Sequence, residues 1–85
     1  MGEWNFNRNQ CIRAFVRLGF SLNKKRHGQH DKYDVPENFR KELPPNVPPF
    51  IMIPRHSELR LQKKIVKEIE LIGGIELVEK FRECL

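Results

Sequence analysis

Apolar residues recur along this chain with two periods, one typical of helices and one typical of strands. Between residues 7 and 18 they fall at three- and four-residue spacings while arginines take another face, which predicts an amphipathic helix. Asn7 is a plausible N-cap and Gly19 stands where a glycine would end the helix. The expected core positions of this helix are Cys11, Ile12, Phe15, Val16 and Leu18.

The following residues alternate between apolar and polar, which is the period of a β-strand. We expect a first strand of about six residues, with Phe20 and Leu22 directed inward and Lys25 outward. Gly28 is the only glycine between Gly19 and Gly73, and it is positioned to form the turn of a hairpin.

A second strand is predicted to open at His30. Side chains two residues apart share a face of a strand, so Tyr33 and Val35 form the expected core pair. His30, Lys32 and Asp34 then lie together on the wetter face.

Five of the six prolines fall within residues 36–49, which predicts a long loop because proline removes backbone donors that a sheet interior needs. Residues 50–53 are predicted to form a short strand that ends at Pro54, which suits either an edge strand or the end of a strand. This strand completes a three-stranded antiparallel sheet.

Two further amphipathic helices are predicted after the sheet. The first has Ser57 as its cap and ends at Gly73 and Gly74, with one apolar face made of Leu61, Ile65, Ile69 and Ile72. The second, residues 75–85, is short and acidic and has an apolar face made of Leu77, Val78, Phe81 and Leu85. It either completes the core or docks a partner.

The chain of 85 residues has the length of one domain, 1–85. Its net charge is +5, and 14 of its 16 Lys and Arg residues precede residue 68. This basic part favours a polyanionic partner such as nucleic acid, although a basic charge without a specific partner is the alternative. No apolar run approaches the length of a membrane span, so we expect a cytoplasmic protein without membrane attachment.

The two cysteines, Cys11 and Cys84, lie near opposite ends and show no metal-ligand spacing. We therefore expect free thiols, with neither a zinc site nor a disulfide, and no metal or other cofactor. The chain also lacks a phosphate-binding glycine loop, a paired-carboxylate constellation and a serine-nucleophile motif.

His30 is the candidate for acid–base chemistry. Histidine titrates near neutral pH, and a fixed ammonium beside it at Lys32 is the combination that a phosphodiester substrate needs. RNA carries its own nucleophile, so its cleavage requires a base, an acid and cations at the phosphate, here Lys25, Arg26 or Lys32.

The alternative for His30 is a histidine without a catalytic role. His27 is either the partner acid or base of His30 or a solvated turn residue, and His56 has either a site role or a hydrogen-bonding role at a helix start. Tyr33 is a possible stacking residue for a base, but its place beside Val35 favours the core. Lys63, Lys64 and Lys67 suit either a solvated helix face or phosphate contacts.

Three stretches in this order carry a resemblance to a known family. Residues 12–20 (IRAFVRLGF) resemble a first helix that runs into "GF" or "GW", residues 28–33 (GQHDKY) resemble "GSHHxF/Y", and residues 53–56 (IPRH) resemble "vPrH". Together they make the chain similar to the HicA family of bacterial and archaeal toxins over most of its length. Gln29 departs from the pattern, since many members have Ser there.

The resemblance implies an α+β fold like a double-stranded-RNA-binding domain, in the order α-β-β-β-α with an extra C-terminal helix. The helices would lie on one face of a three-stranded antiparallel sheet. It further implies a toxin of a toxin–antitoxin system, a metal-independent endoribonuclease that cleaves messenger RNA and is silenced by a HicB-like antitoxin covering the His30 face. His30 inherits the catalytic role, and the candidate RNA-binding residues are Lys24, Lys25, Arg26, Gly28 and Lys32.

Two other functions remain open. The same fold can serve as a non-catalytic RNA-binding module that uses the basic residues, or as a protein-interaction domain that uses the acidic third helix. A dependence of activity on His30 distinguishes the endoribonuclease from the RNA-binding module and from the protein-interaction domain.

Overall fold

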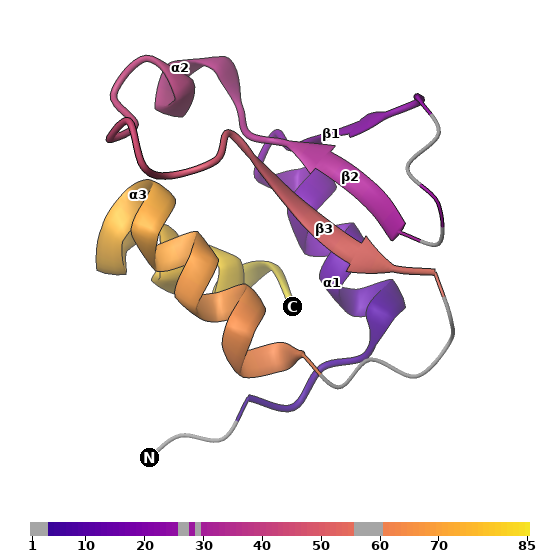
Figure 1. Cartoon of the computed structure of the whole chain (residues 1–85). Helices are drawn as coiled ribbons and strands as arrows, with labels where there is room; N and C mark the ends of the chain where they lie inside the picture. Colours follow the sequence, from indigo (N-terminus) through magenta and orange to yellow (C-terminus); the bar gives the residue numbers. More distant parts are fainter. Residues whose placement is uncertain (1–3, 26–27, 29, 56–60) are drawn as a thin grey trace.

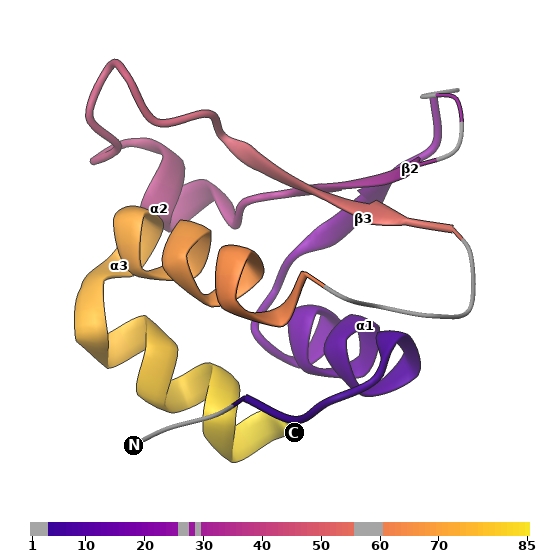
Figure 2. The same cartoon turned by 60° about the horizontal axis from the view of Figure 1, so that its bottom comes forward.

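Six elements follow one another in the computed structural model, which describes residues 4–25, 28, 30–55 and 61–85. They are α1 (Arg8–Arg17), β1 (Ser21–Asn23), β2 (His30–Asp34), α2 (Glu37–Arg40), β3 (Phe50–Pro54) and α3 (Gln62–Cys84). The strands form an antiparallel sheet with β2 in the centre. Figures 1 and 2 show α1 and α3 together on one face of this sheet, with no described helix on the other. The predicted α+β class, with helices on one face of three antiparallel strands, is confirmed.

Local hydrogen bonds explain where α1 begins and ends. The side chain of Asn7 accepts from the backbone N–H of Gln10 at 2.8 Å, and the Gln10 side chain accepts from the backbone N–H of Asn7 at 2.8 Å. This reciprocal capping satisfies two donors that a helix start leaves unpaired. At the other end Gly19 has a φ of 95°, a conformation that favours glycine. Both predicted ends of the helix are therefore confirmed.

The buried face of α1 differs from the prediction at two positions, Ala14 and Val16. Cys11, Ala14 and Phe15 are buried, and they follow the i, i+3, i+4 spacing of one helix stripe. Val16 lies one step off this stripe and is 60% exposed, so its assignment to the core is wrong. Ala14, which was not among the predicted core positions, is fully buried on this stripe.

Phe15 is the centre of the aromatic core. Its ring stacks on Phe20 with centroids 4.6 Å apart, and it meets Tyr33 at 5.8 Å and Phe81 at 5.7 Å. These contacts join α1 to the start of β1, to the inner face of the sheet and to the C-terminal part of α3. Aromatic pairs in such arrangements add about 0.5–1.5 kcal/mol each beyond the area that they bury.

The hairpin follows the predicted alternation on β2 and β1, but one inward residue of β1 is not covered. Tyr33 and Val35 are buried, as expected. β1 has three residues rather than about six, and Leu22 is 46% exposed although it pairs with Tyr33 on the inner face. β1 is an edge strand, so Leu22 has a described neighbouring strand on one side only; it faces inward, as predicted, but stays partly uncovered.

The proline-rich segment is not entirely a loop, since it contains the single turn α2. Phe39 and Leu43 are partly buried and pack against the core, which fixes the segment to the body. Beyond it, β3 pairs only with β2 and is an edge strand, as predicted. The backbone N–H of Val35 donates to the carbonyl of Pro49 at 3.0 Å and so extends the pairing of β2 with β3.

Glycines divide α3 into two amphipathic halves. Gly74 has φ 72° and ψ −169°, outside the helical region, which confirms the predicted break. A Cβ at Gly73 would lie 2.6 Å from the Leu77 side chain, so the turn has no room for one. The buried residues are Ile65, Ile69 and Ile72 before the break and Leu77, Val78 and Phe81 after it.

The apolar face of residues 75–85 thus completes the core, which was one of its two expected roles. Leu61, by contrast, is exposed at the start of α3 and does not belong to the buried face. The predicted cap at Ser57 lies outside the described residues.

Replacing Gly74 with Ala tests the importance of the break in α3. The φ and ψ of Gly74 lie in a region that is essentially restricted to glycine, where another residue costs about 1–3 kcal/mol. We expect Gly74→Ala to lower the free energy of unfolding by that amount in urea denaturation. Glu70→Ala, an exposed change within the helical part of α3, is the control and should change stability by less than about 0.5 kcal/mol. If the free energy of unfolding of Gly74→Ala equals that of the wild type, the break in α3 does not constrain the fold.

Candidate functional site

The sheet face opposite the helices brings together residues from all three strands. The register pairs His30 with Pro54, Lys32 with Met52 and Asp34 with Phe50. Because directly opposed residues in a sheet point to the same face, these pairs line the open face in three rows. Ser21 and Asn23 of β1 extend two of the rows, since they pair with Asp34 and Lys32. We call this surface the open face.

His30 is exposed at the beginning of β2, at one end of the open face. Gly28 precedes it in the hairpin connection with a φ of 67° and with open space where a Cβ would lie. The positive φ predicted for Gly28 as a turn residue is therefore confirmed. Among the described residues, none makes a side-chain hydrogen bond with the imidazole of His30.

Lys32 lies on the same face as His30, as predicted. Its ammonium nitrogen is 4.2 Å from the centre of the Phe50 ring, a cation–π contact between β2 and β3. The ammonium therefore lies over the Phe50 ring, in the row next to that of Lys32 on the side away from His30.

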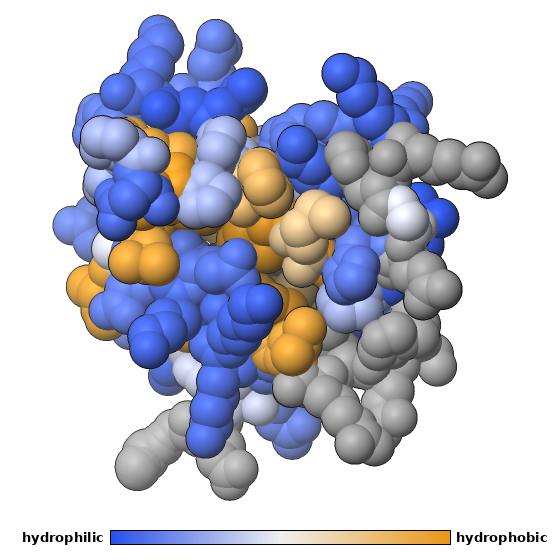
Figure 3. Space-filling view, viewed as in Figure 1, coloured by the Kyte–Doolittle hydropathy of each residue, from blue (hydrophilic) through white to orange (hydrophobic). Residues whose placement is uncertain are grey.

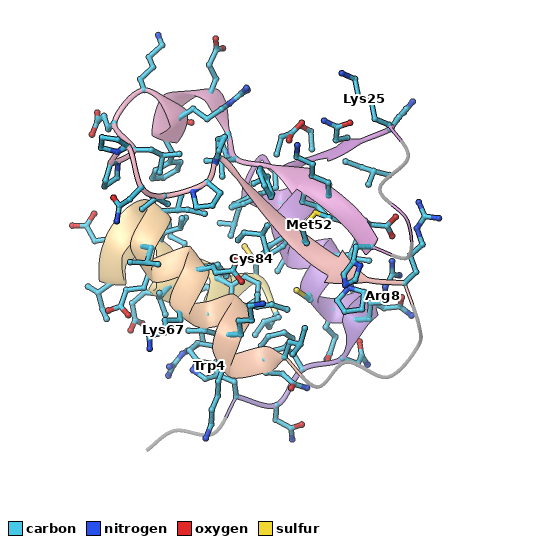
Figure 4. All side chains as sticks on the ribbon, viewed as in Figure 1. Trp4, Arg8, Lys25, Met52, Lys67 and Cys84 are labelled. Carbon is cyan, nitrogen blue, oxygen red and sulfur yellow. The ribbon has the colours of Figure 1, made fainter. Side chains whose placement is uncertain are left out.

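Lys24 and Lys25 follow β1 and are exposed. Asn23 pairs with Lys32, so the two lysines that follow it lie toward the hairpin connection, at the same end of the sheet as His30. The backbone N–H of Lys25 donates to the Asn23 side chain at 3.0 Å, which turns the chain there. Figure 4 shows Lys25 at this corner of the molecule. Arg26, His27, Gln29 and His56 lie outside the described residues.

The basic residues of α3 do not join this group. Lys63, Lys64 and Lys67 are exposed on α3, which lies in the helical layer. Figure 4 shows Lys67 across the molecule from Lys25. These lysines therefore do not share the open face with His30.

A cluster of ion pairs, which the sequence did not reveal, holds the end of β2 that carries His30. The Asp31 carboxylate pairs with the Arg8 guanidinium, and its other oxygen accepts from Nε of Arg55 at 2.9 Å. Nε of Arg8 also donates to the carbonyl of Pro54 at 2.7 Å. The cluster joins α1, β2 and the residue after β3 directly beneath His30. A signal was present: Asp31 shares the inner face of β2 with Tyr33, where a carboxylate needs a cation.

A cavity of about 320 Å³ adjoins this cluster. It is lined by Asn7, Arg8, Asn9 and Arg55. Both guanidinium groups in its wall are bound to Asp31, so their charge is partly neutralised.

Two titratable groups are directed into the core rather than toward the open face. Burial raises the pKa of the Cys11 thiol to about 12, so the thiol stays protonated and is a poor nucleophile at neutral pH. Burial, with a smaller contribution from Asp31, raises the pKa of Tyr33 above 10.0. Tyr33 is 5% exposed, so the possibility that it stacks on a base of the substrate is excluded in this fold.

Neither a metal cluster nor a membrane-spanning helix is present in the described part of the chain. No three His, Cys, Asp or Glu residues there are placed to hold a metal ion. No helix there is both long and apolar enough to cross a bilayer. Cys11 and Cys84 are both free cysteines.

Comparison with known proteins gives no assignment, since no family description, curated protein or solved structure matches this chain.

The ion-pair cluster is tested by removing the charge of Asp31. Asp31→Asn leaves the Arg8 guanidinium partly buried beside a neutral amide, and we expect the free energy of unfolding to fall by about 1–3 kcal/mol. Arg55→Gln, at a side chain that is 50% exposed, should cost no more than about 1 kcal/mol. Urea denaturation of both variants measures the difference. A larger loss in Arg55→Gln than in Asp31→Asn would contradict the central position of the carboxylate.

Proposed function

We propose that this chain is a HicA-like endoribonuclease that cleaves messenger RNA with His30 and is neutralised by a HicB-like antitoxin on the open face. The observation that supports it best is the exposure of His30 on the open face with Lys32 on the same face. An extended RNA strand can reach both groups without any movement of the fold.

The reaction would proceed by transfer within the RNA. A neutral His30 takes the proton of a 2′-hydroxyl, and the 2′-oxygen attacks the adjacent phosphorus atom. The bond from phosphorus to the 5′-oxygen breaks, and the imidazolium returns a proton to that leaving oxygen. The products are a 2′,3′-cyclic phosphate and a 5′-hydroxyl, so no metal ion is required for the proton balance.

Cations near His30 would stabilise the charge that develops on the phosphate. Lys32 shares the face of His30, and Lys24 and Lys25 lie at the same end of the sheet. Fixed positive groups around a developing phosphorane are the electrostatic part of such catalysis.

A second function, a non-catalytic RNA-binding module, is favoured by one observation. Among the described residues, no side chain orients the imidazole of His30, whereas a catalytic base commonly has a partner that does so. In that case affinity for RNA would depend on salt and on the lysines, and removal of His30 would change little.

Replacing His30 with Ala separates the two functions. We expect purified His30→Ala to cleave messenger RNA about 10²- to 10⁴-fold more slowly than the wild type, because the acid–base group is lost. Expression of the wild type in a bacterial host should arrest growth and degrade message, and expression of the variant should do neither. RNA fragments resolved on denaturing gels, with growth curves, give the measurement.

Ser21→Ala is the matched control, since Ser21 is exposed on the same open face but belongs to β1 at the far row. It should retain wild-type cleavage, and circular dichroism should show both variants folded. Equal cleavage by wild type and His30→Ala would rule out the catalytic role of His30. Salt-sensitive RNA binding without cleavage by the wild type would support the binding module instead.

A further inference from the structure

The open face carries an aromatic ring at the end opposite His30. Phe50 begins β3, is only partly buried, and pairs with Asp34 in the third row of the face. Its neighbour in the middle row, Met52, is also partly buried. Figure 3 shows a hydrophobic surface at the centre of this view, and Figure 4 places Met52 there on β3.

From this arrangement we infer that Phe50 is a stacking platform for an unpaired base of single-stranded RNA. The inference rests on the proposed function, because it uses the same face and the same polymer. Exposed aromatic rings on a sheet bind single strands by stacking bases on their π-faces, and this recognition tolerates any base sequence.

The charges along the face set the direction in which the strand would lie. Lys32, Lys24 and Lys25 lie in the middle row or at the His30 end, where phosphates would be attracted. At the Phe50 end the neighbouring charge is Asp34, whose carboxylate accepts from the Asn23 side chain at 3.2 Å. A carboxylate repels phosphate, so this end suits a neutral base rather than the backbone.

The spacing of the rows agrees with this assignment. Phe50 and Pro54 are four residues apart on β3, a distance of about 13 Å at the usual rise of a strand. His30 lies opposite Pro54, so an extended RNA with a base on Phe50 can place a phosphate a few nucleotides away at the imidazole. Lys32 lies between the two and can hold the intervening phosphates.

Phe50 has neighbours from β2 and from α3. Lys32 contacts the face of its ring at 4.2 Å, and Phe50 is also among the residues that line a small hollow, with Val47, Pro48, Glu68, Leu71 and Ile72. An ammonium on a flexible stem can move to a phosphate when RNA binds and leave the ring to the base. A paired duplex could not use the platform, because its bases are already stacked inside the helix.

The test is carried out in a His30→Ala chain, which is expected not to cut its ligand. The probe is a short fluorescein-labelled single-stranded RNA of mixed sequence, and a hairpin that contains the same sequence in a duplex is compared with it. We expect Phe50→Leu to weaken binding of the single strand by about 5- to 150-fold, the range for loss of one stacked base, in fluorescence anisotropy. Phe50→Trp should retain binding, and the duplex should bind no more tightly to the parent than to Phe50→Leu.

Phe39→Leu is the matched control, because it makes the same change at another partly buried ring, in α2 and outside the sheet. It should leave affinity within about twofold, well below the effect of one stacked base. Thermal unfolding of all variants separates lost binding from lost folding, and Phe50→Trp shows whether a ring at this position is sufficient.

Three results of the RNA measurements would overturn the platform: equal affinity of Phe50→Leu and the parent for the single strand, equal sensitivity of the duplex to Phe50→Leu, or no RNA binding at all. An effect of Phe50→Leu on binding of a protein partner alone would also overturn it. The experiment distinguishes failure of the platform inference from failure of the proposed nuclease function. If cleavage requires His30 but not Phe50, only the platform inference is rejected. If RNA binding depends on Phe50 but the wild type does not cleave RNA, only the proposed nuclease function is rejected.

Discussion

Packing of Phe15 against Tyr33 determines which side of the sheet is covered by helices and which side stays open. The two rings meet at 5.8 Å beneath the central strand, and Phe81 closes the same cluster from the C-terminal part of α3. Because side chains alternate along a strand, a buried Tyr33 places Asp31 inward as well and turns His30 and Lys32 outward. A shift of one residue in the register would exchange the two faces, so the position of His30 depends on the aromatic core.

Asp31 connects this core to the end of the sheet that carries His30. On the inner face a carboxylate is costly unless it is paired, and here Arg8 and Arg55 supply cations from α1 and from the residue after β3. The consequence is that α1, β2 and the end of β3 are joined at one point, next to His30. A rigid support of this kind would keep the imidazole of an exposed strand residue in a constant position relative to the rest of the open face.

Much of the fold could be predicted from sequence because its signals are local. The caps of α1, the turn at Gly28, the break at Gly74 and the burial of Tyr33 each follow from neighbouring residues. The error at Val16 is one of helix phase, since the stripe of Cys11, Ala14 and Phe15 leaves it outside. The exposure of Leu22 arises from tertiary structure, because it depends on the place of β1 at the edge of the sheet. The pairing of Arg8 and Arg55 with Asp31 could not be predicted, and neither could the place of Phe50 opposite Asp34. Both depend on the strand register. Placement of His30 and Lys32 on one face needed only the alternation within β2.

The central claim is that the open face at His30 cleaves RNA through the 2′-hydroxyl. Analysis of the ends of the RNA fragments, in excess chelator and with an otherwise identical substrate whose 2′-hydroxyls are replaced by hydrogen, tests it most directly. The account predicts fragments with 2′,3′-cyclic phosphate and 5′-hydroxyl ends, and no cleavage of the deoxy substrate. Fragments with 3′-hydroxyl ends, or cleavage of the deoxy substrate, would contradict it.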